Sequence, residues 1–362
     1  MKNGCSGWLL LLALLFQTPS LIAQDGTPFA VVMFYNLENL YDTEDDSLKQ
    51  DDEFLPQGER RWSRFRFYTK LTRISKVITN TGYWEPPAII GLCEVENRQV
   101  LEKLVAFGPL RSWNFSIIHK DSPDERGIDV AAIYRPSVFT PVSYRYFPPV
   151  LPGEPIPFTR EILCVTGILS DSDTLHLFFN HWPSRYSGLM ETRALRNKAA
   201  DRLRYEIGKI WERHPRAKII IMGDFNDQPE DESLCNHLEA GKKTTGHSGH
   251  LFNLSYHWMK EGKGTLKHGS QWNVFDQVII TENLLDRDSR LFCLPEDARI
   301  LDAPFLLEPD DNYTGSKLNR TYQGFTYHGG YSDHLPVMLM LRNKEGKGTG
   351  AKEENVRSET DK

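Results

Sequence analysis

Short apolar runs bounded by turn residues are the dominant pattern of this sequence, and they predict β-strands. The runs are rich in Val, Ile, Leu and Phe, and Gly, Pro, Asn or Asp follows most of them. The predicted strands span residues 29–36, 88–94, 113–119, 129–135, 161–169, 174–181, 218–224, 273–280 and 335–341.

Three other segments have apolar residues three or four positions apart, the spacing of an amphipathic helix. They are residues 62–80, 97–107 and 190–212; in the first, the apolar positions predicted to face the core are Trp62, Phe65, Leu71, Ile74, Val77 and Ile78. Many buried strands beside few helices predict two packed β-sheets with helices on the outside. No repeat and no change of composition marks a second domain.

The two ends of the chain and two internal segments do not follow these patterns. Lys2 precedes the apolar run 8–16, and Ala23 stands at a cleavage position, so residues 1–23 predict a signal peptide. The alternative is an uncleaved N-terminal anchor, although the run is shorter than the roughly 20 apolar residues of a transmembrane helix. Residues 43–59 and 241–271 are expected to be loops, and residues 343–362 a disordered tail. We therefore expect an exported protein, periplasmic or extracellular, without an integral membrane segment after cleavage.

Composition limits the classes of partner. The 362 residues carry a net charge of −6, so the chain as a whole does not attract nucleic acid or an anionic membrane. A polyanionic substrate would have to be held by a local basic patch or by a metal ion. Four cysteines follow the predicted signal peptide, with no CxxC pair and no zinc-ligand spacing. The sequence does not decide whether one disulfide forms among Cys93, Cys164, Cys235 and Cys293.

Polar side chains stand at the ends of the predicted strands in several distant parts of the chain. A carboxylate after a strand is commonly a turn or helix cap. Here, however, polar residues stand at the ends of several predicted strands, and loops at one edge of a sandwich bring distant residues together. The residues are Asn36, Glu94, His181, Asp224, Asn226, Asp276, Asp333 and His334.

The residue types in this set suit one kind of chemistry. Carboxylate and amide oxygens without cysteine are hard ligands, which favour Mg²⁺ or Mn²⁺ over zinc. A histidine beside an aspartate supplies an oriented base or electrostatic partner, and an asparagine supplies a donor to a phosphoryl oxygen. The set therefore predicts a metal-assisted phosphoryl transfer site.

Several motifs in a fixed order resemble the endonuclease/exonuclease/phosphatase superfamily, whose fold is the deoxyribonuclease-I-like fold. They are FYNLENLYD, GLCEVEN, NHWPSR, GDFND, FDQVII and YSDHLP, and the resemblance covers about residues 29–342. NLENLYD and EVENR are most similar to exported members from Bacteroidetes-type bacteria. The resemblance implies an α/β fold, a four-layer α/β/β/α sandwich of two mixed β-sheets flanked by helices.

The resemblance also implies a role for each polar residue. Glu94 would be the main metal ligand, with Asn36 beside it and Asp333 completing the metal side. Glu38 is a weaker candidate for a second ion or a metal-bound water. The expected cofactor is Mg²⁺ or Mn²⁺, and whether one or two ions bind is open.

The remaining residues would carry the catalytic steps. Asp224 and Asn226 would face the attacking water and the phosphate. Asp276 would hold the imidazole of His334, which contacts a non-bridging oxygen or helps to activate water. His181 would be the second histidine, which in some branches acts as acid toward the leaving oxygen. Abasic-site endonucleases of the superfamily usually carry Asn at that position, so His181 argues against that branch.

Two basic features are candidates for substrate contact. Arg185 lies four residues after His181 and could hold a substrate phosphate, although a loop arginine is often surface decoration. Residues 59–70 interleave Arg60, Arg61, Arg64 and Arg66 with aromatic residues, a pattern compatible with a single nucleic-acid strand. The same spacing also fits an ordinary helix with a core-facing apolar side.

We therefore expect an exported Mg²⁺-dependent nuclease that hydrolyses phosphodiester bonds of DNA or RNA by in-line attack of an activated water. The alternative is the same chemistry on another substrate, as a phosphatase or a sphingomyelinase-like phospholipid phosphodiesterase. An inactive binding scaffold is disfavoured because the polar set is complete. A protein partner cannot be inferred from the sequence, and the sequence does not distinguish DNA, RNA, lipid and small phosphoesters as substrates.

Overall fold

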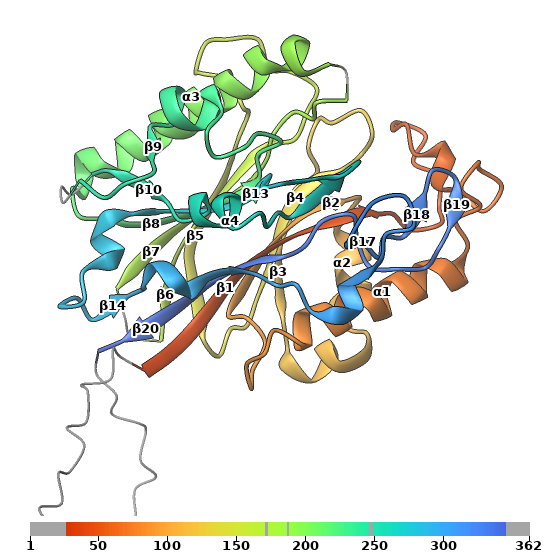
Figure 1. The fold of residues 1–362 in the computed structure, drawn as a ribbon, viewed down its shortest axis with the longest axis horizontal. Helices are drawn as coiled ribbons and strands as arrows, with labels where there is room; N and C mark the ends of the chain where they lie inside the picture. The colour runs from red at the N-terminus through yellow and green to blue at the C-terminus, as the bar shows by residue number, and fades with distance from the viewer. Residues whose placement is uncertain (1–26, 171–172, 187, 246–248, 345–362) are drawn as a thin grey trace, which may run out of the picture.

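The computed structural model describes residues 27–170, 173–186, 188–245 and 249–344, and these residues form two large β-sheets with helices on the outside (Figure 1). Each large sheet has seven strands and contains both parallel and antiparallel pairs. The predicted α/β sandwich of two mixed sheets is therefore confirmed. Within the described ranges, no helix is both long enough and apolar enough to cross a membrane.

The first sheet contains the N-terminal strand, which lies between a parallel and an antiparallel neighbour. Its strands, in spatial order, are β14 (Leu291–Phe292), β20 (Val337–Asn343), β1 (Thr27–Leu40), β2 (Ile89–Val95), β4 (Asp129–Tyr134) and β3 (Ser116–Ile118), and β15 (Ala298–Ile300) also pairs with β20. In Figure 1, β1 and β20 run side by side although they come from opposite ends of the chain.

The second sheet carries His181, Asp224 and Asp276 at the ends of its strands. Its strands, in spatial order, are β5 (Phe139–Phe147), β6 (Ile162–Leu169), β7 (Thr174–His181), β8 (Lys218–Asp224), β13 (Asp276–Thr281), β10 (Leu251–Asn253) and β9 (Ala240–Gly241). Strands β7 and β8 are parallel, and the long helix α3 (Leu189–Arg213) connects them. Figure 1 shows α3 covering the outer face of this sheet.

The other elements are short or lie on the opposite side. Helices α1 (Arg64–Thr79) and α2 (Arg98–Val105) accompany the first sheet, and α4 (Tyr256–Lys260) is a single short turn of helix. Three small hairpins extend from the sandwich: β11 (Leu266–His268) with β12 (Gln271–Asn273), β16 (Leu307–Pro309) with β17 (Ser316–Leu318), and β18 (Tyr322–Gln323) with β19 (Thr326–Tyr327).

Strand β8 shows how the sequence builds the layers. Successive side chains of a strand point to opposite faces, and every residue of β8 is buried. Ile220 and Met222 enter the core between the two sheets, whereas Ile219 and Ile221 pack under α3. A continuous apolar run is what a strand covered on both faces requires. The polar residues at its end are therefore fixed by a rigid element.

Most predicted elements are present, with four corrections. Helix α1 begins at Arg64, after the N-cap Ser63; Trp62 is buried before the helix, but Phe65 is 77% exposed and does not face the core. Only Ser116–Ile118 of the predicted strand 113–119 is a strand. Residues 241–271, predicted to be a loop, contain β10, α4 and β11. Strand β5 was not predicted, because it lies at the sheet edge and only its end residues, Phe139 and Phe147, are buried.

The predicted signal peptide, residues 1–23, lies outside the described residues. So does the predicted tail from residue 345 onward, while β20 extends to Asn343, one residue into the segment expected to be disordered. Cys93, Cys164, Cys235 and Cys293 are all free thiols. The disulfide that sequence left open is therefore absent among these four residues.

Candidate active site

Three catalytic candidates occupy neighbouring positions across the second sheet. His181, the last residue of β7, is paired in register with Asp224, the last residue of β8, and Asp224 is paired with Asp276, the first residue of β13. All three side chains are buried. Gly223 permits this arrangement because a Cβ atom there would lie 2.5 Å from the carbonyl oxygen of Asn180 on β7. The glycine is thus required inside the strand, where β8 approaches β7 closely.

The first sheet supplies Asn36 and Glu94 to the same place. The amide of Asn36 on β1 donates to Asp224 Oδ2 at 3.1 Å and to Glu94 Oε1 at 3.4 Å. His181 Nε2 lies 3.8 Å from Glu94 Oε1 and 3.7 Å from Asp224 Oδ2. Residues from both sheets therefore meet at one edge of the sandwich.

His334 is held tightly on the other side of Asp224. Its Nδ1 lies 2.6 Å from Asp276 Oδ2, and its Nε2 lies 3.8 Å from Asp224 Oδ2. Its backbone N–H donates to the hydroxyl of Ser332, which donates in turn to the carbonyl oxygen of Asn36. The segment that carries His334 is therefore tied to β1, and the Asp276–His334 pair predicted from sequence is present.

Asn226 borders the cluster and is positioned by its own loop. Its backbone N–H donates to Asp224 Oδ1 at 3.0 Å, and its side-chain amide donates to the carbonyl oxygen of Trp182 at 3.1 Å. Arg185 donates to the carbonyl oxygen of Asn226 and pairs with Asp227 and Asp231. In the structure Arg185 thus supports the Asn226 loop, and its contact with a substrate phosphate stays a prediction.

Asp333 belongs to an adjoining network of charges. Its Oδ2 accepts from Arg320 at 2.8 Å, and Arg320 also contacts Glu38 Oε1 at 3.1 Å. Lys70, buried on α1, lies 3.8 Å from Glu38 Oε2. Burial, together with the charge of Asp333, raises the pKa of Glu38; burial also lowers the pKa of Lys70. Burial opposes ionisation of Asp333 as well, but Arg320, His334 and Lys70 hold its pKa below the usual value.

Sequence reasoning missed the two cations of this network. Lys70 lies three residues after the core residue Phe67 and four before Ile74, so a lysine on the apolar face of the helix was an available signal. Arg320 lies in an irregular loop between two hairpins, where no periodic pattern distinguishes it. Both residues bring positive charge next to Asp333 and Glu38.

Backbone strain is concentrated around the site. Glu38, Asn39, Glu94 and Asn226 have φ angles of 50°, 60°, 60° and 52°, in the left-handed region that side chains seldom adopt. Glu94 also interrupts the pairing of β2 with β4, as expected for a β-bulge. Asn39 N–H donates to Glu94 Oε2 at 2.9 Å and thereby fixes the carboxylate. Such strain persists only where the surroundings hold it in place, and it clusters at functional sites.

The buried titratable groups of the site have shifted pKa values and therefore different protonation states. Burial raises the pKa of Asp224 to about 7, against the opposing charge of His334 and with support from Asp276. Although burial opposes the charged imidazole, Asp276 and Asp224 raise the pKa of His334 well above its ordinary value. Burial, followed by Arg160 and Arg126, lowers the pKa of His181 well below its ordinary value. The two histidines therefore carry different charges at neutral pH.

The residues fit a hard divalent cation. Oxygen atoms of Glu94 and Asp224 both accept from the amide of Asn36, and Asp276 Oδ1 is buried without a hydrogen-bond partner in the described part of the chain. One donor atom from each of Asp224, Asp276 and His334 lies within 4.8 Å of the others. Negative charge of this density is stable when a cation lies beside it.

The rim of the site combines cations with exposed aromatic rings. Tyr186 follows Arg185 and is almost fully exposed; Phe325 lies in the β18–β19 turn and is 60% exposed. Arg60 lies over the rings of Tyr322 and Phe325, and the backbone N–H of Tyr322 donates to Glu38. The basic segment 59–70 is therefore connected to the site through β18. Its exposed arginines are Arg61 and Arg64, whereas Arg60 and Arg66 pack on aromatic rings.

A cavity of about 340 Å³ opens beside Asp333. Arg320, Asp333 and Tyr313, the last from the loop between β16 and β17, all line it. Asp310 fixes this loop by accepting from the backbone N–H of Tyr313 at 3.1 Å and from Lys267 at 2.6 Å. The cavity is large enough for one group attached to a phosphate bound at the site.

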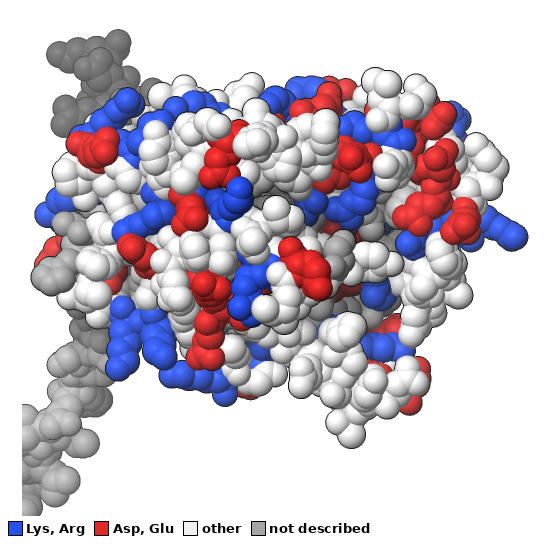
Figure 2. Space-filling model, turned by 90° about the horizontal axis from the view of Figure 1, so that it is seen from above, with Lys and Arg blue, Asp and Glu red and all other residues white. Residues whose placement is uncertain are grey.

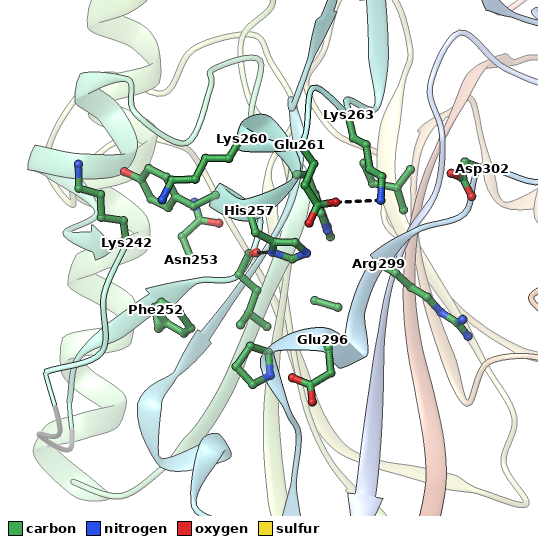
Figure 3. Close-up of a pocket in the computed structure, with 16 residues that line it drawn as sticks. Lys242, Phe252, Asn253, His257, Lys260, Glu261, Lys263, Glu296, Arg299 and Asp302 are labelled. Atoms are coloured by element: carbon green, nitrogen blue, oxygen red, sulfur yellow. Dashed lines mark hydrogen bonds and ion pairs between the residues drawn. The ribbon is translucent and has the colours of Figure 1, made fainter. Parts of the chain in front are cut away.

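Two other features resemble sites but lie apart from these residues. His119 Nε2 lies 2.8 Å from Asp129 Oδ2, and Asp129 also accepts from the backbone N–H of Ser122, so Asp129 has a structural role. A cavity of about 640 Å³ near α4 contains none of the catalytic candidates (Figure 3). Its charges are of both signs, and Glu261 and Lys263 pair with each other at 2.9 Å.

Comparison with known proteins agrees with the fold. The structure of a humanized D. rerio TDP2 with 14 mutations matches 87% of this chain and 99% of its own, at 13% identity and a TM-score of 0.53. D. rerio TDP2 in complex with a single-strand DNA product matches 87% of this chain and 99% of its own, at 14% identity and a TM-score of 0.50.

A protein of the endonuclease/exonuclease/phosphatase family from Bacteroides thetaiotaomicron matches 88% of this chain and all of its own, at 14% identity and a TM-score of 0.50. No curated protein matches the sequence. The model of the Endonuclease/Exonuclease/phosphatase family matches residues 31–343. The chain therefore belongs to the endonuclease/exonuclease/phosphatase family.

Proposed function

We propose that this protein is a Mg²⁺- or Mn²⁺-dependent phosphodiesterase that cleaves nucleic acid, preferably single strands, by attack of water on phosphorus. The observation that carries the proposal is the contact series from Glu94 through Asn36, Asp224 and His334 to Asp276 at the edge where the two sheets meet. Family membership supports phosphoester hydrolysis as the reaction class.

Glu94 and Asn36 are the residues we assign to the metal, with Asp333 on its neighbouring side. A bound divalent ion would neutralise negative charge on the phosphoryl group. Arg320 holds the Asp333 carboxylate from the side of Glu38 and Lys70. The charge network thus orients Asp333. Asn36 and His181 each lie beside two carboxylates, that of Glu94 and that of Asp224.

Asp224 is the group we assign to accept the proton of the attacking water. With its pKa raised by burial to about 7, Asp224 is a stronger base than an ordinary carboxylate and is still partly ionised at neutral pH. Asn226 N–H fixes one carboxylate oxygen, so the other faces Asn36 and both histidines. A proton on this oxygen would lie beside the phosphate that is being attacked.

The two histidines would contact the phosphoryl oxygens in different charge states. His334 is positively charged at neutral pH and donates from Nδ1 to Asp276, so its Nε2 N–H is free to stabilise a negatively charged oxygen. A charged imidazole cannot accept a proton, so His334 acts as an electrostatic partner and not as the base. His181 is neutral and contributes one hydrogen bond.

Nucleic acid is the preferred substrate because the rim offers both stacking and positive charge. Exposed Tyr186 and Phe325 are ring surfaces on which bases can stack, and Arg61 and Arg64 lie on the segment connected to the site through β18. Single-stranded nucleic acid presents its bases to such rings, whereas a duplex does not.

The second candidate is hydrolysis of a small phosphoester, favoured by the 340 Å³ cavity beside Asp333. Purified full-length protein should be incubated with single- and double-stranded DNA, RNA, a nitrophenyl phosphodiester, a nitrophenyl phosphomonoester and sphingomyelin vesicles, with Mg²⁺ and with chelator. We expect Mg²⁺-dependent cleavage of single strands to be fastest. Turnover of only the monoester or the lipid would replace the nuclease assignment with the second candidate.

Export is the remaining part of the proposal. It is supported by the charged and apolar pattern of residues 2–23, which suits a cleaved signal. Expression of the full chain in a bacterial host, followed by cell fractionation and N-terminal sequencing, tests it. A protein that stays in the cytoplasm with residues 1–23 attached would contradict it.

A further inference from the structure

Two adjoining cavities lie at the end of the second sheet opposite to the catalytic residues. The smaller has a volume of about 230 Å³, and the larger about 830 Å³. Both are lined by Thr166, His176, Arg213 and His214, so they form one continuous hollow. His176 precedes His181 by five residues on β7, which places the hollow about 16 Å from the catalytic histidine.

The end of α3 explains why a hollow exists here. Ser143, Thr166 and His176 are paired in register across β5, β6 and β7. They continue the outer face of the sheet on which Cys164 and Phe178 pack under α3. Because α3 ends at Arg213, the last part of this face has no helix above it. Its polar side chains form the floor, and the C-terminal turn of α3 forms a wall.

The lining is strongly basic. Arg145, Lys209 and Arg213 line the smaller cavity together with His176 and His214, and no carboxylate lines it. The larger cavity adds Arg216, Lys218 and a single carboxylate, Asp173, which is paired with Lys218. By contrast, acidic and basic side chains are interspersed over the face that carries α3 (Figure 2). The charges of the cavity near α4 are also mixed (Figure 3).

Several of these cations have no acidic partner. In the described part of the chain, Arg145, Arg213 and His214 make no ion pair, and the guanidinium of Arg145 packs over the ring of Phe147 at 5.2 Å. His176 Nδ1 lies 3.0 Å from the hydroxyl of Thr166. Its Nε2 makes no hydrogen bond to another of the described residues. Burial, then the positive charges of His214 and Arg145, lower the pKa of His176 to about 4.

A role in helix stability accounts for only part of this arrangement. Positive charge near the C-terminus of a helix is favourable, and this explains Arg213 and His214. It does not explain Arg145 or His176, which come from strands of the sheet and point into the same cavity. Arg145, Arg213 and His214, which make no ion pair in the described chain, together with the neutral imidazole of His176 and the hydroxyls of Ser143 and Thr166, have the donor set of an oxyanion site.

We propose that the smaller cavity is a second anion site, which binds a phosphate or sulfate group on Arg145 and Arg213 above the hydroxyls of Ser143 and Thr166. The group can come from free inorganic phosphate or from the phosphates of a nucleic-acid strand, which would continue past Arg216 and Lys218 in the larger cavity. The site does not depend on the catalytic assignment, because its residues lie at the other end of the sheet.

The test uses the full chain in excess chelator, so that no turnover occurs. The pKa of His176 is measured by NMR from its ring proton, with and without inorganic phosphate, in the wild type, in Arg145→Gln/Arg213→Gln and in the control Arg98→Gln/Arg111→Gln, whose arginines lie on helices beside the first sheet. Binding of a fluorescent single-stranded oligonucleotide is measured in the same three proteins at low salt. Thermal unfolding establishes that all three are folded.

A bound anion stabilises the charged imidazole, so we expect phosphate to raise the pKa of His176 in the wild type and the control, but not in the double variant. If a strand is the source, oligonucleotide affinity falls about fivefold or more in the double variant alone. If phosphate raises the pKa of His176 but oligonucleotide affinity does not fall in the double variant, the ligand is free phosphate. If oligonucleotide affinity falls but phosphate does not change the pKa, the ligand is a nucleic-acid strand. The proposal is overturned if the double variant behaves as the wild type does in both measurements.

Discussion

The two ends of β7 lie in surroundings of opposite charge: the C-terminal end, with His181, is the acidic end, and the part nearer the N-terminus, with His176, is the basic end. His181, at its C-terminal end, lies within 4 Å of carboxylates from Glu94 and Asp224. His176, nearer its N-terminal end, lies among Arg145, Arg213 and His214. Burial lowers the pKa of both imidazoles, so both are neutral at pH 7. The same residue type therefore acts in an acidic pocket that needs a cation and in a basic pocket that receives an anion.

The ends also differ in how they are held. At the acidic end, four residues have left-handed φ angles, and hydrogen bonds from both sheets hold them. At the basic end, no residue that lines the smaller cavity has a positive φ in the described chain, and the arginines are exposed. Strain and burial at one end indicate preorganisation for chemistry. The relaxed, open end suits binding alone.

The largest effect should come from the acidic end. We expect Glu94→Gln to lower kcat by about 10³-fold or more, because a lost metal ligand removes several kcal/mol of transition-state stabilisation. Glu102→Gln, at an exposed position on α2, is the matched control and should leave kcat unchanged. Steady-state rates with single-stranded DNA at several Mg²⁺ concentrations measure both. Equal rates of Glu94→Gln and wild type, or undiminished turnover in excess chelator, would contradict the metal assignment.

His334 and Asp276 should fail together. We expect His334→Ala and Asp276→Asn each to lower kcat by about 10²- to 10⁴-fold, because either change removes the charged, oriented imidazole. The double variant should be little slower than the slower single variant, since the two residues act as one unit. Independent, additive losses in kcat would show that the pair does not share a step. Unfolding curves of each variant separate these losses from reduced stability.

Sequence could name residues that meet at the acidic end of β7 because they lie at or beside strand termini: His181 and Asp224 end β7 and β8, Asp276 begins β13, and His334 precedes β20. The run 218–222 becomes a doubly buried strand, and its register with β7 and β13 brings Asp224 beside His181 and Asp276. The edge strand β5 was missed because only its two end residues are buried, so it shows neither an apolar run nor an alternation of buried and exposed positions. The strained φ angle of Glu94 could not be predicted either, because the β-bulge depends on pairing with β4. The sequence identified Glu94 as a candidate metal ligand, but it did not predict the orientation of the Glu94 side chain.

The basic end could not be predicted, for a related reason. Arg145, His176 and Arg213 are far apart in sequence, and each is an ordinary polar position of its own element. They converge only because α3 ends before the sheet does. The same holds for Arg320, which acquires significance through its contacts with Glu38 and Asp333. Charged residues outside periodic elements thus need the tertiary structure before a role can be assigned.

A smaller effect is expected at the rim of the acidic end. Arg61→Ala/Arg64→Ala should raise KM for single-stranded DNA about tenfold and reduce the slope of log affinity against log salt by about 0.7 for each phosphate that is no longer neutralised. A nitrophenyl phosphodiester should be hydrolysed at the wild-type rate, because it reaches the site without this segment. Arg98→Ala/Arg111→Ala serves as the control for net charge. If polymer and small substrate respond alike, the arginines are only a solvated helix face, and the small-phosphoester candidate gains.

The smallest effect concerns stability at the basic end. Burial, His214 and Arg145 lower the pKa of folded His176 to about 4, below roughly 6.5 for an unfolded histidine. The unfolded chain therefore binds more protons between these values, and His176 destabilises the fold as pH falls from about 6.5 to 4. We expect His176→Gln to reduce the loss of unfolding free energy between pH 7 and pH 5 by on the order of 1 kcal/mol, after a discount for solvent screening.

Urea unfolding of His176→Gln and wild type at both pH values measures this difference, and His268→Gln, at an exposed position on β11, is the control. Added phosphate should also reduce the acid destabilisation of the wild type, because an anion beside His176 favours its charged form. An equal response of His176→Gln and wild type to pH would show that the basic field does not act on this imidazole, and would remove the contrast between the two ends of β7.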